Sequence, residues 1–509
     1  MEQMEPPWVG PQQGMTWTLI CTMIVLVVAS CLVPLYSCPA GNVECVPEAA
    51  ASVPASVGIA VRRACACNTS TTVRVSTNAR TLSNTVFSGL TTDTPDARGQ
   101  SALAVIMAQF VLHDIYQPRH AGVTASSSIP QPDPVFAATP STDLIFPVPT
   151  TWTVGACEDP VSDATPVIDL SNVYGDGNTL YIRSGTQGLL NMSGGDDNDA
   201  KLTMPPTAPD GSYSIPDGRD AGSSGLLAMH TLAMRNHNFW AREVRRMRPT
   251  WTDAQLFWKA RQLNIAEWQH IVYHEWLPVL LGALAPPVDT SATVYDSGAD
   301  VRVDLEVATI ILPSLINTMM PDAFVRRRAP SISYTQYAGD PETADPLGVN
   351  GVLARLSQTP ARLVDVHVID MLRNIVNASN GYPVDTVAND VQLARVLRIP
   401  DWAAIYTCIG ASPIAGDSRD AYQAMLEEPL YPGTSMGLTA GTVLANHFAR
   451  ARDTDPNFYS YTASKASIGR VFYPFVKKAT MLGLLYRNTR IPYGVNDIPQ
   501  NGDNVFSVQ

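Results

Sequence analysis

The chain has 509 residues, of which 45% are hydrophobic and 16% are charged, so it is large enough to bury a sizeable core. Its 34 Lys and Arg residues and 46 Asp and Glu residues give a net charge of −12 at pH 7. Because it has no basic stripe that could neutralise phosphates, its composition argues against a nucleic-acid partner.

The N-terminal 40 residues are expected to be a targeting or anchoring element. Residues 15–36 carry no charged side chain, and their apolar centre suits either the core of a signal peptide or a short membrane helix. No Lys or Arg precedes this stretch, so residues 1–40 are read as a signal peptide or a membrane anchor. Either alternative predicts a secreted or membrane-anchored protein, whose contact with the membrane is made by this segment.

Six cysteines outside this apolar stretch could pair as disulfides in an oxidising compartment. They are Cys38, Cys45, Cys65, Cys67, Cys157 and Cys408. Residues 41–75 combine three of them with many Ala, Val, Pro and Thr residues, which predicts a Cys-containing linker. Residues 76–509 are then expected to form one large body.

The body is predicted to be mainly α-helical, with long irregular loops. Helical spacing of apolar residues predicts three helices, of which one opens on a capping box formed by Thr252 and Gln255. The predicted helices cover residues 226–247, 252–276 and 305–320. No stretch shows sustained alternation of apolar and polar residues, so few strands are expected. The stretches 116–165 and 185–224 are rich in Pro, Gly and Asp and are expected to be loops.

A further short helix, at residues 107–114, carries three chemically different polar groups. Gln109 and His113 are four residues apart and therefore share one helical face, whereas Asp114 points to a neighbouring side. A partly buried, hydrogen-bonded histidine would explain this segment if it stood alone. Later segments of the chain supply the partners that a functional helix of this kind would need.

Five segments in this order resemble the animal haem peroxidases, a superfamily that also includes the fatty-acid dioxygenases. They are MAQFVLHD at 107–114, TPVIDLSNVYG at 165–175, MHTLAMRNHN at 229–238, LPVLLG at 277–282 and HFARARDTD at 447–455. The resemblance extends over roughly residues 76–509 and implies the helical domain of that family. It also implies a haem oxidoreductase that uses hydrogen peroxide and a small reductant.

The resemblance assigns catalytic roles to three residues. His113 matches the histidine that takes a proton from hydrogen peroxide and returns it to the leaving oxygen, and Gln109 matches a glutamine one turn earlier. Arg219 lies eleven residues before the histidine of the third segment, which is the spacing of the arginine that stabilises the separating charge. The acidic residues through which the family attaches its haem are replaced by Leu112 and Gly222.

The segment that binds the haem iron in the family departs from the family pattern in this chain. Ile316 stands at the position of the histidine that binds iron, and Pro313 at that of a nearby arginine. No histidine occurs between residues 275 and 366, so a small shift of the alignment does not supply one. Met319 and Met320 could offer thioether ligands, although filling gaps in the core is the simpler role for them.

The resemblance also implies a calcium site. Its ligands would be Asp114, Thr165, the backbone carbonyl of Val167, Asp169 and Ser171, all of which offer the hard oxygen atoms that calcium prefers. Asp114 precedes the others by about fifty residues in the sequence, so the site predicts that the two segments meet in the fold.

Two classes of function stay open at this point. By resemblance the protein is a peroxide-dependent haem oxidoreductase outside the cytosol, with calcium and haem b as cofactors. By its residues it is a catalytically inactive pseudoperoxidase that keeps a structural calcium site for a binding or surface role. Haem held without a strong axial ligand, with weak activity, would lie between these two.

Overall fold

The computed structural model of the chain describes residues 59–65, 77–89, 94–154, 157–175, 183–193, 200–288, 294–339, 344–377, 380–411, 419–491 and 504–508. The chain divides into two units, Met1–Gly41 and Asn42–Gln509, and all of the described residues belong to the second. The expected anchor therefore lies outside the described residues, as does most of the expected linker. Among the described helices, none combines the length and the apolar character needed to span a membrane.

The described chain is mainly helical, as predicted from the sequence. Its helices are α2 (Ala79–Thr85), α3 (Ala102–Ile115), α4 (Ser171–Tyr174), α5 (Ser224–Met247), α6 (Asp253–Ile271), α7 (Leu277–Leu281), α8 (Leu312–Met319), α9 (Tyr334–Tyr337), α11 (Val349–Gln358), α12 (Asp370–Arg373), α13 (Thr386–Val396), α14 (Trp402–Cys408), α15 (Ala421–Leu426), α16 (Leu438–Asp453), α17 (Thr462–Ile468), α18 (Tyr473–Val476) and α19 (Met481–Asn488). Short 3-10 or π-helical turns are η1 (Phe136–Ala138), η3 (Gly218–Gly222), η4 (Val272–Trp276), η5 (Gly282–Leu284) and η6 (Val307–Ile311).

Short antiparallel sheets complete the described fold. The strands are β1 (Ile59–Ala60), β2 (His120–Ser128), β3 (Asp143–Pro149), β4 (Thr151–Val154), β5 (Cys157–Ser162), β6 (Ala323–Arg326), β7 (Ala329–Ser333), β8 (Ile375–Val376) and β9 (Pro383–Val384). They pair in the order β1-β5-β4 and in the hairpins β2-β3, β6-β7 and β8-β9.

Four of these strands, β2 to β5, occupy the stretch 116–165 that was expected to be a loop, so that expectation is wrong. In β3 the side chains of Leu144 and Phe146 are buried and that of Ile145 is exposed, which is the alternation of a half-buried strand. Strand β1 belongs to the expected linker, and it pairs with β5. Cys65 is bonded to Cys408, so this part of the expected linker packs on the body.

The three predicted helices are found with small changes. The capping box of α6 is present, because the Thr252 hydroxyl accepts from the Gln255 amide and the Gln255 side chain accepts from the Thr252 amide. Residues 305–320 form the π-helical turn η6 followed by α8. Pro313 lies inside this continuous helical segment, just after the π-helical turn, where the hydrogen-bond pattern already departs from that of a regular α-helix.

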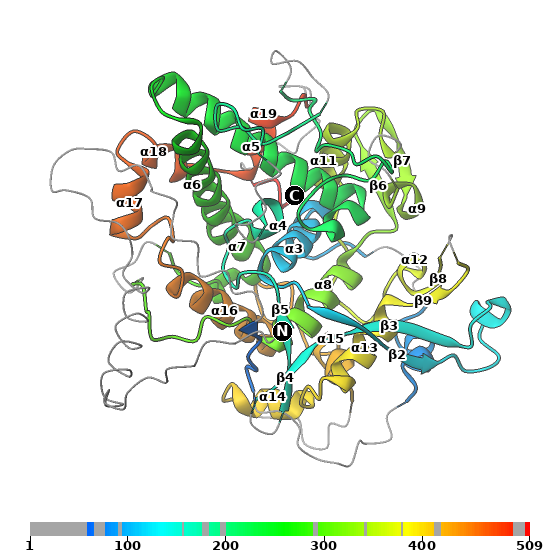
Figure 1. The fold of residues 1–509 in the computed structure, drawn as a ribbon. Helices are drawn as coiled ribbons and strands as arrows, with labels where there is room; N and C mark the ends of the chain where they lie inside the picture. Colours follow the sequence, from blue (N-terminus) through cyan, green and yellow to red (C-terminus); the bar gives the residue numbers. More distant parts are fainter. Residues whose placement is uncertain are drawn as a thin grey trace, which may run out of the picture. The chain divides into compact units, whose positions relative to one another are not determined.

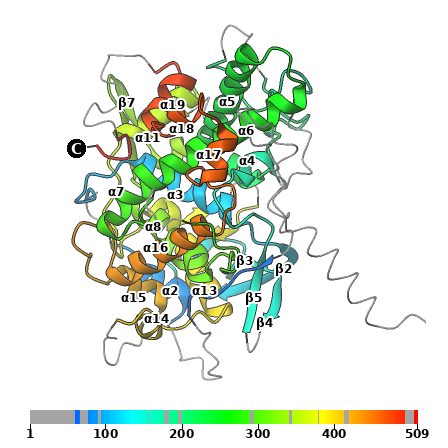
Figure 2. The same cartoon turned by 90° about the vertical axis from the view of Figure 1, so that its left-hand side faces the viewer.

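Helix α3 is buried on almost every side. Twelve of its fourteen residues are buried, and it packs against α5, α8 and α11 (Figures 1 and 2). Because almost no face of α3 meets water, any polar side chain that it carries must find a partner inside the protein.

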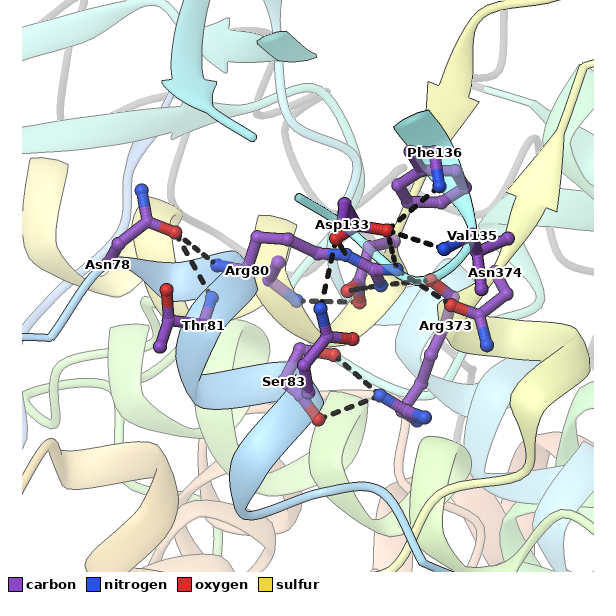
Figure 3. A network of polar contacts seen from close by, with 12 residues as sticks. Asn78, Arg80, Thr81, Ser83, Asp133, Val135, Phe136, Arg373 and Asn374 are labelled. Carbon is purple, nitrogen blue, oxygen red and sulfur yellow. Dashed lines mark hydrogen bonds and ion pairs between the residues drawn. The ribbon is translucent and has the colours of Figure 1, made fainter. Parts of the chain in front are cut away.

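A buried arginine joins three segments that are distant in sequence (Figure 3). Arg80 on α2 has no exposed surface, and its guanidinium donates to the carboxylates of Asp133, at 2.8 Å, and Asp385, at 2.7 Å. It also donates to the Arg373 carbonyl and lies 4.1 Å over the ring of Phe136. Burial opposes ionisation of Asp133, but the bonds from Arg80 and two backbone amides hold the pKa of Asp133 well below its usual range. Burial raises the pKa of Asp385, so the ionised pair in this buried network is Arg80 with Asp133.

Replacing Arg80 with Met should destabilise the fold by about 3–5 kcal/mol, because two buried carboxylates would lose their cation. The free energy of unfolding is measured by chemical denaturation. Arg246→Met, which breaks an exposed ion pair with Glu243, is the control and should cost less than about 1 kcal/mol. Equal losses in the two variants would contradict this assignment.

Candidate functional site

His113, the histidine predicted to take a proton from hydrogen peroxide, is held by an aspartate that sequence reasoning did not single out. His113 is 8% exposed near the end of α3, and its Nδ1 lies 2.6 Å from Oδ1 of Asp220 in the turn η3. Burial opposes ionisation of Asp220, yet hydrogen bonds from His113 and His230 lower the pKa of Asp220 to about 2. Because an ionised carboxylate can only accept, Nδ1 of His113 carries the proton and Nε2 is left as the basic nitrogen.

Asp220 is the centre of a small polar network that joins three segments. Its second oxygen accepts from Nδ1 of His230 on α5 at 3.1 Å and from the side-chain amide of Asn172 on α4 at 3.1 Å. All four side chains are buried. The network fixes the ring of His113 in one orientation and one tautomer, which is what a general base requires.

Arg219 lies beside the end of α3, but its charge is already paired. Its guanidinium donates to both carboxylate oxygens of Asp217, and also to the backbone carbonyls of Tyr116, at 3.0 Å, and His113, at 3.3 Å. The contacts therefore join Arg219 to the main chain of His113 rather than to its ring. An arginine neutralised in this way has little charge left with which to stabilise a developing anion.

Helices α3 and α8 each leave one stripe less buried than the rest. On α3 the half-buried residues are Gln109 and Leu112, and on α8 they are Pro313 and Ile316. In both helices the two residues are three apart and so share a face. The predicted catalytic glutamine and the predicted position of the iron ligand both belong to these stripes.

The stripe on α8 offers no ligand for iron. Pro313 and Ile316 present only carbon atoms, and Ile316 packs against the hydrophobic core. Met319 and Met320 are each 3% exposed within that core, which agrees with the simpler role expected for them. The neighbouring Asn317 donates to the carboxylate of Asp390 at 2.8 Å, and burial raises the pKa of Asp390 to about 8.

A second buried histidine–carboxylate pair lies close to this region. His447 on α16, which packs against η6, is 1% exposed, and its Nδ1 is 3.3 Å from the carboxylate of Asp304. Arg450 donates to the same carboxylate at 2.7 Å. Burial lowers the pKa of His447 despite this partner, so the ring is neutral. Its Nε2 is buried without a hydrogen-bond partner in the described structure.

The residues of the predicted calcium site meet at the end of α3. The carboxylate of Asp114 accepts from the backbone amides of Leu170, at 3.1 Å, and Ser171, at 2.5 Å, and its own carbonyl accepts from the Ser171 hydroxyl at 2.6 Å. The Thr165 hydroxyl donates to Asp169 at 2.6 Å. Val167 is buried in the same short loop. The two segments that the sequence separates by about fifty residues are therefore in direct contact.

The carboxyl groups at this point repel one another. Burial raises the pKa of Asp114 well above its usual range, and the charge of Asp169 raises it further. Burial also raises the pKa of Asp169, although the nearby charge of Arg261 opposes this. Burial raises the pKa of Asp455 to about 7, and Asp169 again contributes. A divalent cation among these groups would remove the repulsion.

Sequence reasoning missed the residues that hold His113. Ligand atoms of His113, Asp217 and Asp220 lie within 4.8 Å of one another. They are engaged, however, because Asp217 is bonded to Arg219 and Asp220 to the two histidines. The two aspartates that bracket Arg219 in the sequence were the available signal.

Comparisons with known proteins identify the family of the chain. The family model for the animal haem peroxidases matches residues 64–416. Peroxinectin A from Dictyostelium discoideum is 25% identical over 345 residues, which cover 60% of this chain and 64% of that protein. Eosinophil peroxidase from Homo sapiens is 29% identical over 279 residues, which cover 47% of this chain and 38% of that protein. The chain thus spans less than two thirds of the length of these curated relatives.

Solved structures show the same fold. Peroxidase A from Dictyostelium discoideum superimposes with a TM-score of 0.76 at 20% identity, covering 91% of this chain and 96% of that one. A fatty acid alpha-dioxygenase from Arabidopsis thaliana superimposes with a TM-score of 0.74 at 15% identity, covering 89% and 80%. Since the family model matches more than half of its length, the chain belongs to the animal haem peroxidase family.

Proposed function

We propose that this chain is a pseudoperoxidase, which keeps the family's fold and distal histidine without sustaining peroxide-dependent oxidation. The observation that carries the proposal is the half-buried stripe of α8, where Pro313 and Ile316 offer no atom that could bind iron. The residues on this side therefore do not fit a histidine-ligated haem b. A binding or surface role is the function that the retained fold would serve.

The contacts of His113 and Arg219 also support the proposal of a pseudoperoxidase. Asp220 holds His113 with a basic Nε2, so His113 could accept a proton from a bound peroxide or water molecule. Arg219 is paired with Asp217, which weakens any stabilisation of negative charge on the leaving oxygen. This set can orient and deprotonate a small ligand, but it has no partner that could be oxidised.

Purified protein mixed with haem should show no stable Soret band, and its oxidation of guaiacol by hydrogen peroxide should not exceed that of free haem. Ile316→His and Pro313→His are the substitutions expected to create haem binding, because both positions lie on the half-buried stripe of α8. Val471→His, at an exposed position, controls for haem bound by any surface histidine. A stable Soret band in the unaltered protein, with turnover lost in His113→Ala, would refute the proposal.

Peroxide-dependent oxidation of a small reductant is the second candidate function, and one observation favours it. His447 carries a carboxylate on Nδ1 and an unpartnered Nε2, which is the arrangement of a metal-binding histidine. If the unaltered protein binds haem, His447→Ala should abolish the Soret band under this second proposal. A band that survives in His447→Ala would exclude His447 as the ligand.

We also propose a structural calcium site formed by Asp114, Thr165, the carbonyl of Val167, Asp169 and Ser171. The support is chemical, because these groups are oxygen donors, and two buried carboxyl groups there repel each other. Such a site would stabilise the contact between α3 and the loop before α4 whether or not haem is bound.

Calcium should raise the melting temperature of the protein relative to a chelator, and Asp169→Asn should remove this rise. At a hundredfold excess over its Kd, calcium would add about 2.7 kcal/mol to the free energy of unfolding. Asp210→Asn, at an exposed position, is the matched control and should keep the response.

The calcium response should also grow as the pH rises. The folded-state pKa values of Asp114 and Asp169 are raised, so without calcium their contribution to stability is full below about pH 4 and is lost as the pH rises through those values. Calcium requires the deprotonated carboxylates and offsets this loss. Thermal unfolding with calcium and with chelator at pH 5 and pH 8 measures the effect, and a larger response at pH 5 would count against the site.

We further propose that the body lies outside the cytosol, secreted or anchored near its N-terminus. The disulfide between Cys65 and Cys408 supports this, because such bonds persist in oxidising compartments. In protein recovered from its own cells under thiol-blocking conditions, both cysteines should resist alkylation until a reductant is added. Free thiols at both positions would contradict the proposal.

A further inference from the structure

A pocket with two arginines lies away from the residues discussed so far. It has a volume of about 390 Å³, within the range of small-molecule sites. Its lining comes from the region of α5, α11 and α19, and the first of these helices packs against the other two (Figures 1 and 2). Arg235 of α5 and Arg490, just after α19, both line it. Among the described residues that line the pocket, none is acidic.

Arg235 is buried, and it has no counter-ion among the described residues. It is 4% exposed, and it donates to the carbonyls of Thr203 and Asn488 and to the side-chain oxygen of Asn350, all of them neutral. Burial lowers the pKa of Arg235 to about 10. Its Nη2 makes no hydrogen bond within the described part of the chain. A buried cation of this kind is stabilised when an anion reaches it.

The N-terminus of α11 opens into the same pocket. Gly348 is its N-cap and has no side chain that could accept from the first turn, and Gly348, Val349 and Asn350 line the pocket. Within the described residues, the backbone amides of Val349 and Asn350 have no hydrogen-bond acceptor. The carboxylate of Asp345 lies against Gly351 in the first turn of α11 and is bonded to Arg326 and Arg355. Arg235 and the two amides without an acceptor therefore favour an anion at one place.

The rest of the lining is apolar. Leu202 and Leu347 are 44% and 49% exposed, and Met204 and Val349 continue the wall. Apolar surface beside a cationic end favours a ligand with an anionic head and a hydrocarbon tail over a bare inorganic ion.

We infer that this pocket binds an organic anion composed of a carboxylate head, held by Arg235, Arg490 and the start of α11, and a short aliphatic tail against Leu202 and Leu347. The pocket uses none of the residues assigned to the polar network around Asp220, to α8 or to the calcium site. The inference therefore stands or falls independently of the proposed function.

Binding is tested by isothermal titration calorimetry of the full chain with octanoate, octanol and inorganic phosphate. Octanoate should bind, whereas octanol, which lacks the charge, and phosphate, which lacks the tail, should each bind about tenfold more weakly or worse. Octanol binding as tightly as octanoate, or phosphate binding more tightly, would overturn the inference, as would no binding of octanoate.

Variants locate the site. Arg490→Gln is the main one, because Arg490 is exposed and its replacement leaves the core intact, and it should weaken octanoate binding about tenfold. Arg235→Lys keeps the charge but loses the planar fork, and should weaken binding similarly. Leu347→Ser should weaken octanoate and leave phosphate unchanged. Arg470→Gln, an exposed arginine outside the lining, removes the same charge and should have no effect. Unchanged binding in both Arg490→Gln and Arg235→Lys would refute the assignment.

Discussion

The burial of α3 is the constraint on which the rest of the site depends. A helix surrounded by α5, α8 and α11 can carry polar groups only if each is satisfied from inside, because an unpartnered buried polar group costs about 1–3 kcal/mol. Two consecutive residues, His113 and Asp114, meet this demand in opposite directions. His113 turns to Asp220 in the loop before α5, and Asp114 receives the amides that begin α4. The helix thus fixes two distant loops at once.

The contacts around α3 hold the fold together whether or not α8 supplies a ligand for iron. The interior charges near α3 are balanced by protein groups, since Asp220 is bonded to two histidines and Asp217 to Arg219. Asp114 and Asp169 are the exception, and a bound cation would complete their balance. None of these interactions needs a histidine on α8. Pro313 is accommodated as well, because it closely follows the π-helical turn η6.

Much of the helical framework could be predicted from the sequence, because helix signals are local. The capping box of α6 lies within four residues, and it was found where it was expected. The strands β2 and β3 were missed because their signal is weak: β2 is composed largely of small and polar residues, and β3 contains two prolines. Their stability comes from pairing with each other, which a single stretch of sequence does not reveal.

Some residues of the candidate site could be predicted from short motifs, whereas others became evident only from contacts between distant segments. The resemblance of individual segments predicted roles for His113, Asp114 and Asp169. Asp220 lies 107 residues from its partner His113 and falls outside the five matched segments. Arg235 belongs to a segment that was recognised, yet only the fold reveals that it has no carboxylate partner among the described residues. A residue's chemistry in this protein is set less by its own identity than by the charges that packing brings to it. For that reason α5 carries, five residues apart, a histidine that is hydrogen-bonded to a carboxylate and an arginine that has no carboxylate partner among the described residues.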